Sequence, residues 1–200
     1  MALQLTMRRM HGVSCATYET GHTRAFYHGR TDTVRTLSAE SAAFCDAMLA
    51  ADATDAAKHA ALQAACASHA EQVQRVLTGQ GIDRHLLGLY IGCHLSGKSD
   101  PLPAIFTDRA YKLSGGGGNY RLSTSNTGYT PMFGGFSPMT ADGYGVCYTQ
   151  LESRMNLIIS CHRSCAETCA VAFRDTLTKT LVELRTLCSG DAEKSPTANL

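Results

Sequence analysis

Apolar residues recur at steps of three and four positions in several parts of the chain, a spacing typical of helices with one apolar face. In the closing segment, Phe173, Leu177, Leu181 and Leu184 fall on one such face. The expected helices are residues 1–10, a helix capped by Ser38, residues 53–77, a short helix capped by Asp83, and the closing helix capped by Ser164.

Short strands are expected in the second half of the chain, after four consecutive glycines at 115–118 that mark a loop. The strands are predicted at residues 120–123, 145–150 and 156–161. The last two form a hairpin around a turn at 151–154. The order helices, strands, helix predicts an α+β fold. We expect one domain over residues 1–188 and a polar tail at 189–200.

The composition is that of a folded chain without an obvious nucleic-acid partner. Of the 200 residues, 44% are hydrophobic and 18% are charged, and the formal net charge is +1. Neither wholesale disorder nor binding to nucleic acid or an anionic membrane surface is therefore expected. No run approaches the ~18–20 apolar residues of a membrane span. Arg8 and Arg9 follow the apolar start, which is the wrong order for a secretory signal, so a reducing compartment is expected.

The nine cysteines are expected to be reduced and mostly buried, because an odd number is scattered over a chain longer than typical disulfide-rich domains. Cys161, His162, Cys165 and Cys169 form the tightest cluster. Cys161 is expected to end a strand and the two later cysteines to lie on the next helix, so packing is favoured over a metal site. We expect no metal.

Two other patterns have simpler explanations than catalysis. The glycines at 115–118 lack the lysine and hydroxyl of a phosphate-binding loop, which favours a hinge or a close backbone approach. Ser123 and Ser125 lack the G-x-S-x-G elbow and an assignable partner among the eight histidines, which argues against a serine hydrolase.

Four motifs resemble those of the choline/carnitine O-acyltransferase family, in the family's order and spacing. They are Tyr18-Glu19-Thr20 followed by Gly29–Arg35 (GRTDTVR), Asp83–Leu89 (DRHLLGL), Ser123-Thr124-Ser125, and Asp142–Tyr148 (DGYGVCY). The resemblance extends from Met1 to about Leu187. It implies the C-terminal part of that family's two-domain fold, which is similar to chloramphenicol acetyltransferase, with a mixed sheet and flanking helices.

Within the family, the stretches Ser114–Tyr120 and Phe26–Arg30 resemble the octanoyl-transferring branch most closely. The choline-specific relatives replace the two threonines of the GRTDT stretch and the arginine of the DRHLLGL helix. This chain keeps Thr31, Thr33 and Arg84, so the resemblance implies carnitine as the alcohol.

The resemblance also implies roles for carnitine-binding residues. Arg84, Tyr18 and Thr31 match the residues that bind the carnitine carboxylate, which needs charge-assisted partners once removed from water. Phe136 matches the phenylalanine beside the trimethylammonium group, and Ser123 lies nearby on the strand. From the residues alone, an ion pair between Arg84 and Asp83 is the simpler alternative.

Further matches concern acyl transfer and coenzyme A, the expected co-substrate; no permanently bound cofactor is expected. Ser125 matches the serine that stabilises the tetrahedral oxyanion, and Glu19, Thr20 and Asn126 match positions near coenzyme A. The family usually has glutamine where Asn126 stands. Gly134 aligns with a methionine that closes the acyl pocket in acetyl-specific members, so an open medium-chain pocket is implied. Gly135 takes this place if the register shifts by one, and the simpler alternative is that both glycines serve a tight turn or bulge before Pro138.

The family's general-base histidine belongs to a motif that none of the 200 residues match. We therefore expect a C-terminal fragment, inactive alone, whose partner is the missing N-terminal half or an intact homologue. The alternative is a catalytically inactive module that binds carnitine or coenzyme A. The final tripeptide Ala198-Asn199-Leu200 resembles a peroxisomal address; without it, a mitochondrial or cytoplasmic location is expected.

Overall fold

A computed structural model describes residues 1–98, 100–128 and 134–192, and the side chains up to residue 190. The chain folds as two compact units, each assembled from separate stretches of sequence. Of the described residues, the first unit contains 1–14, 38–68 and 171–192, and the second contains 15–37 and 69–170. Within the described ranges, no helix is long and apolar enough to cross a membrane.

The first unit is helical. Its helices are α1 (Ala2–His11), α2 (Ala39–Leu49), the first part of α3 (Asp55–Leu77) and α7 (Ala170–Ala192). The predicted cap at Ser38 is confirmed, because its hydroxyl accepts a hydrogen bond from the backbone N–H of Ser41. Leu5, Phe44 and Met48 form an apolar core with Ala65. Arg9 donates to Thr180 and Glu183 and so joins α1 to α7.

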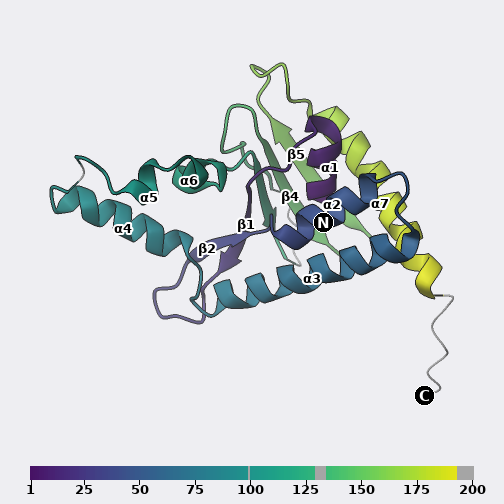
Figure 1. The fold of residues 1–200 in the computed structure, drawn as a ribbon, viewed down its shortest axis with the longest axis horizontal. Helices are drawn as coiled ribbons and strands as arrows, with labels where there is room; N and C mark the ends of the chain where they lie inside the picture. Colours follow the sequence, from purple (N-terminus) through teal and green to yellow (C-terminus); the bar gives the residue numbers. More distant parts are fainter. Residues whose placement is uncertain (99, 129–133, 193–200) are drawn as a thin grey trace. The chain divides into compact units, whose positions relative to one another are not determined.

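The second unit contains a five-stranded mixed sheet with the order β2-β1-β3-β4-β5 (Figure 1). The strands are β1 (Thr17–His22), β2 (Thr31–Arg35), β3 (Leu122–Asn126), β4 (Tyr144–Gln150) and β5 (Met155–Cys161). The pairs β1–β3 and β3–β4 are parallel, whereas β1–β2 and β4–β5 are antiparallel. Together with the helices this confirms the expected α+β class, and β4–β5 is the predicted hairpin.

Helices α4 (Asp83–Leu95), α5 (Ala104–Thr107) and α6 (Arg109–Leu113) follow α3 and lead to β3 through a 3-10 turn at Gly116–Gly118. Helix α4 leads away from β2, and α5 and α6 return beside it (Figure 1). Two of the four glycines permit the expected close approaches. A Cβ at Gly115 would lie 2.2 Å from the Tyr120 ring, and one at Gly116 would lie 2.4 Å from the carbonyl oxygen of Tyr111.

Several expectations about the elements are wrong. Strands β1 and β2 were not predicted, because their sequences TYETGH and TDTVR carry almost no apolar residues and are held by pairing instead. The third strand begins at Leu122 rather than at residue 120. The closing helix begins at Ala170, not after Ser164, because the backbone N–H of Cys169 donates to the hydroxyl of Tyr144 and holds the chain in turns.

The cysteines also differ from expectation. Only Cys15, Cys45 and Cys147 are buried, while three others are exposed. Cys161 does end a strand, but Cys165 and Cys169 precede the helix rather than lying on it. In the described part of the chain, no three His, Cys, Asp or Glu side chains are grouped in a way that could hold a metal ion.

Candidate functional site

One face of the sheet collects most of the polar residues singled out from the motifs. Tyr18 of β1 pairs with Arg35 of β2 and with Ser123 of β3. Side chains of paired residues, and of alternate residues along a strand, lie on the same side of a sheet. This side, called the site face below, therefore carries Tyr18, Thr20, Thr31, Thr33, Arg35, Ser123 and Ser125.

Phe136 lies on the site face over β4. The residue beneath it is Gly145, which pairs with Ser123. A Cβ at Gly145 would lie 2.8 Å from the carbonyl oxygen of Phe136 and 3.1 Å from its ring, and the Ser160 hydroxyl donates to that carbonyl. Gly145 thus lets the segment before β4 approach the sheet, which places the half-buried Phe136 ring over the residue that pairs with Ser123.

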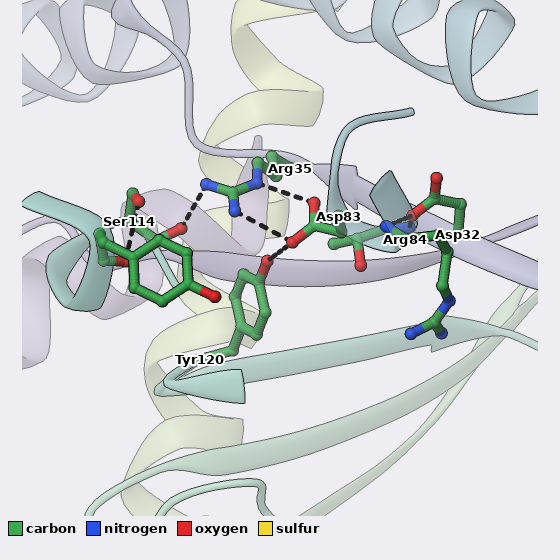
Figure 2. A network of polar contacts seen from close by, with 8 residues as sticks. Asp32, Arg35, Asp83, Arg84, Ser114 and Tyr120 are labelled. Atoms are coloured by element: carbon green, nitrogen blue, oxygen red, sulfur yellow. Dashed lines mark hydrogen bonds and ion pairs between the residues drawn. The ribbon is translucent and has the colours of Figure 1, made fainter. Parts of the chain in front are cut away.

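Arg84 reaches the same region from the first turn of α4. Its Nε donates to the carbonyl oxygen of Thr31 at 2.9 Å, and an Nη lies 3.5 Å from the Thr31 hydroxyl. The ion pair between Arg84 and Asp83 that the sequence offered as an alternative is not formed, because Asp83 is bound by Arg35 instead. Figure 2 shows the Arg84 side chain leading away from that pair. Its exposed guanidinium can therefore receive an anion.

The helix cap at α4 differs from the prediction. Asp83 is the first helical residue and does not cap the helix; the N-cap residue Ile82 has no capping side chain. The cap comes from the sheet, since Asp32 accepts hydrogen bonds from the backbone N–H groups of Arg84 at 3.2 Å and Thr33 at 2.7 Å. Sequence reasoning missed this role of Asp32, although its place in the GRTDT stretch beside Thr31 was a usable signal.

Two hollows meet at Arg84. The larger, about 970 Å³, is also lined by Tyr18, Thr33 and Tyr120, and it ends against apolar and aromatic side chains of α4 and α5. The smaller, about 340 Å³, is lined by Thr31 and Arg84 together with His28 and Arg30. A cation with hydroxyl and aromatic neighbours, set in an open cavity, is suited to a small anionic ligand.

Glu19 lies on the opposite side of the sheet from the site face, and it is buried, with 8% exposure. Its carboxylate accepts hydrogen bonds from the Thr124 hydroxyl at 2.6 Å, the Asn126 backbone N–H at 2.9 Å and the Tyr148 hydroxyl at 3.1 Å. Three donors satisfy a buried carboxylate. Glu19, which was expected near coenzyme A, thus joins β1 to β3 and β4 by hydrogen bonds.

The other expected coenzyme A positions are more accessible. Asn126 is exposed at the end of β3, and its side-chain oxygen accepts a hydrogen bond from the backbone N–H of Gly128 at 2.8 Å. Thr20 is half-buried on the site face. Ser125 is half-buried and Ser123 is buried, at 4% exposure. A ligand therefore reaches the outer end of β3 more easily than its middle.

Gly134 does not line the 970 Å³ cavity. It is exposed and borders a hollow of only about 10 Å³ with Cys147 and Ile158, which belong to the site face of β4 and β5. Because Cys147 pairs with Ser125, this hollow adjoins the serine end of the site.

Tyr120, Tyr144 and Tyr148 are expected to ionise only when the chain unfolds. Burial raises the pKa of each hydroxyl; Asp83 raises the pKa of Tyr120 further and Glu19 that of Tyr148. The unfolded chain ionises near pH ~10, so stability is retained below that pH and falls above it. Tyrosinate absorbance should rise in a late step coinciding with loss of circular dichroism, and Tyr148→Phe should shrink that step. Ionisation of all tyrosines in a folded chain would contradict this.

A family model described as Choline/Carnitine o-acyltransferase matches residues 1–179. The human protein "Carnitine O-acetyltransferase" is 39% identical over 188 residues, which is 94% of this chain and 29% of that protein. The bovine "Peroxisomal carnitine O-octanoyltransferase" is 41% identical over 168 residues, 84% of this chain and 27% of that protein. The chain thus spans less than a third of the length of these relatives.

Proposed function

Because the chain belongs to the choline/carnitine O-acyltransferase family, we propose that it serves the transfer of a medium-chain acyl group between coenzyme A and carnitine. The observation that carries the proposal is the site face, which carries Tyr18, Thr31 and Ser123, with Arg84 bound at Thr31 on β2 and Phe136 over Gly145 on β4. A guanidinium at one end and an aromatic ring at the other suit a small zwitterion.

Carnitine fits this arrangement in one orientation. Its carboxylate would bind the Arg84 guanidinium, which forms charge-assisted hydrogen bonds, with the hydroxyls of Tyr18 and Thr31 as further donors. Its trimethylammonium group would lie against the Phe136 ring, whose face attracts a cation. Ser123 lies between the two ends and would contact the middle of the ligand.

Ser125 would stabilise the oxyanion of the transfer step. The carnitine oxygen attacks the thioester carbonyl carbon, a C–O bond forms and the C–S bond breaks. The hydroxyl proton passes to a general base and then to the sulfur of coenzyme A. The base would be the family's histidine, which this chain does not supply, so the chain contributes the binding and oxyanion residues only.

Coenzyme A would approach the exposed end of β3, at Thr20 and Asn126. Glu19 would support this contact indirectly, since it is buried and holds the backbone N–H of Asn126. An alternative, a catalytically inactive module that binds carnitine or coenzyme A, shares this half-site and differs only in turnover.

Calorimetric titration of the 200-residue chain tests the proposal. Carnitine should bind, and choline, which lacks the carboxylate, should bind at least about tenfold more weakly because a charge-assisted pair is lost. A thiol-release assay with octanoyl-CoA should show no turnover by the chain alone, since a general base typically contributes about 10²–10⁴-fold.

A chimera distinguishes the acyltransferase from the catalytically inactive binding module. In it, the chain replaces the matching 168 residues of the bovine octanoyltransferase. Carnitine-dependent thiol release by the chimera supports the enzyme, whereas carnitine binding without turnover supports the inactive module. Equal binding of choline and carnitine would contradict both.

We also propose a peroxisomal location, supported by the name of the bovine relative and the final tripeptide. The tripeptide, residues 198–200, lies outside the described residues. A fluorescent reporter carrying residues 189–200 at its C-terminus should accumulate in peroxisomes, and the same reporter without the last three residues should not. A diffuse signal from both would contradict the proposal.

A further inference from the structure

A half-buried ion pair lies beside the proposed carnitine-binding residues, and one of its members, Asp83, lines the same cavity as Tyr18 and Arg84. Arg35, at the end of β2, binds both carboxylate oxygens of Asp83, at 2.9 and 3.0 Å. The two side chains are only 22% and 15% exposed. A third guanidinium nitrogen of Arg35 donates to the carbonyl oxygen of Ser114 at 2.6 Å. The pair therefore joins the sheet, the first turn of α4 and the segment before the glycine run (Figure 2).

Tyr120 completes this network and connects it to Tyr18. Its hydroxyl donates to Asp83 at 2.8 Å, and its ring, 3% exposed, lies 6.0 Å from the Arg35 guanidinium. The ring of Tyr18 meets the Tyr120 ring edge-on, with centroids 5.6 Å apart. Asp83 thus accepts three hydrogen bonds, and it adjoins Arg84 in the sequence. Two of the proposed carboxylate-binding residues are connected through one aspartate.

Two glycines allow the backbone to pass close to the side chains around this network. A Cβ at Gly81 would lie 2.2 Å from the Asp32 carboxylate that caps α4, and one at Gly115 would lie 2.2 Å from the Tyr120 ring. Gly115 also has a positive φ of 96°, which side-chain-bearing residues rarely adopt. The close contacts of these two glycines keep the first turn of α4 and the Tyr120 ring in one arrangement.

We propose that Arg35, Asp83 and Tyr120 are positioning residues, which fix Arg84 and Tyr18 so that both meet the same carboxylate. This rests on the proposed carnitine function. A buried ion pair adds little net stability, because desolvation offsets the attraction, whereas a binding site gains from groups held in place before the ligand arrives. Arg35 is itself on the site face but is occupied on all three nitrogens by Asp83 and Ser114.

Asp83→Asn in the 200-residue chain tests the inference, because it keeps the shape of the side chain and removes the charge. Carnitine affinity should fall about ten- to a hundredfold, the size of effect that small misplacements produce. Tyr120→Phe, which keeps the ring under Tyr18, should weaken binding less. The double variant Arg35→Gln with Asp83→Asn should bind carnitine no more weakly than the weaker-binding of the two single variants. The reason is that both substitutions break the same ion pair, so their effects should not add.

Asp142→Asn is the matched control. It removes another arginine–aspartate pair of the second unit, Arg121–Asp142 at 2.8 Å, in which the arginine is 24% exposed and the aspartate 46% exposed. Carnitine affinity should stay unchanged in this variant. An equal loss of affinity in Asp142→Asn and Asp83→Asn would show a general effect on folding and overturn the positioning role.

The exchange rate of the Arg84 backbone amide hydrogen reports how firmly the first turn of α4 is held, and it can be measured without carnitine. The backbone N–H of Arg84 is bound by Asp32, so Asp83→Asn should speed its exchange about tenfold if the first turn of α4 loosens. Unchanged exchange overturns the inference whether or not carnitine binds. Failure of the unaltered chain to bind carnitine, with accelerated exchange in the variant, would instead overturn the proposed function and leave the positioning of Arg84 supported.

Discussion

Arg84→Ala is expected to weaken carnitine binding by about 2–5 kcal/mol, roughly 30- to 4000-fold, the usual effect of truncating one partner of a hydrogen-bonded charge pair. Arg84 is anchored at 2.9 Å on the carbonyl oxygen of Thr31 and has no acidic partner in the described part of the chain, so its charge is available to the ligand. Calorimetry on the chain measures the dissociation constant. In the chimera, KM for carnitine should rise while KM for acyl-CoA changes little.

Two variants make this result specific. Arg84→Lys keeps the charge but loses the planar fork, and it should give an intermediate loss. Arg154→Ala removes an exposed arginine from the turn between β4 and β5 and should leave carnitine binding unchanged. Equal increases in both KM values for Arg84→Ala would mean that the arginine supports the fold rather than the ligand.

Gly134→Met in the chimera is expected to lower octanoyl-CoA turnover by roughly 50-fold while acetyl-CoA turnover survives. Each buried methylene is worth ~0.8 kcal/mol, so three displaced methylenes cost ~2.4 kcal/mol. The structure leaves room for the new side chain, because a Cβ at Gly134 meets nothing within 4 Å and the neighbouring hollow includes Cys147, the partner of Ser125.

The neighbouring glycine gives the comparison. A Cβ at Gly135 would lie 2.9 Å from Ile158, so Gly135→Ala should disturb β5 and lower turnover with both acyl groups. Gly134→Ala should change neither strongly, since a Cβ at this position meets nothing within 4 Å. Parallel loss of octanoyl and acetyl turnover in Gly134→Met would show that this glycine serves the backbone and not an acyl pocket.

Some features followed from the sequence because they depend on local chemistry. The cap at Ser38, the end of α3 before Gly79 and the β4–β5 hairpin each rest on residues within a few positions of one another. The motifs also picked out Tyr18, Thr31, Ser123 and Arg84 before their proximity was known. Their shared face was partly predictable, since the alternation along β3 already placed Ser123 and Ser125 on one side.

Other features depended on contacts between distant segments. Strands β1 and β2 have too few apolar residues to be recognised locally, and hydrogen bonding to each other and to β3 makes them strands. The cap of α4 is Asp32, some fifty positions before the helix residue it binds. Asp83 was misread as a cap for the same reason, because its true partners, Arg35 and Tyr120, lie 48 and 37 positions away.

The sequence by itself therefore determined the family, the residue types of the site and the helices whose signals are local. Only the tertiary structure decided which face each side chain occupies. Glu19 follows Tyr18 directly in the chain, but its side chain lies on the other side of the sheet, because successive residues of a strand point to opposite sides. There Glu19 is buried and joins three strands by hydrogen bonds. The tertiary structure also bound Asp83 to Arg35 and left Arg84 open to a ligand, because pairing and register are set by the whole sheet.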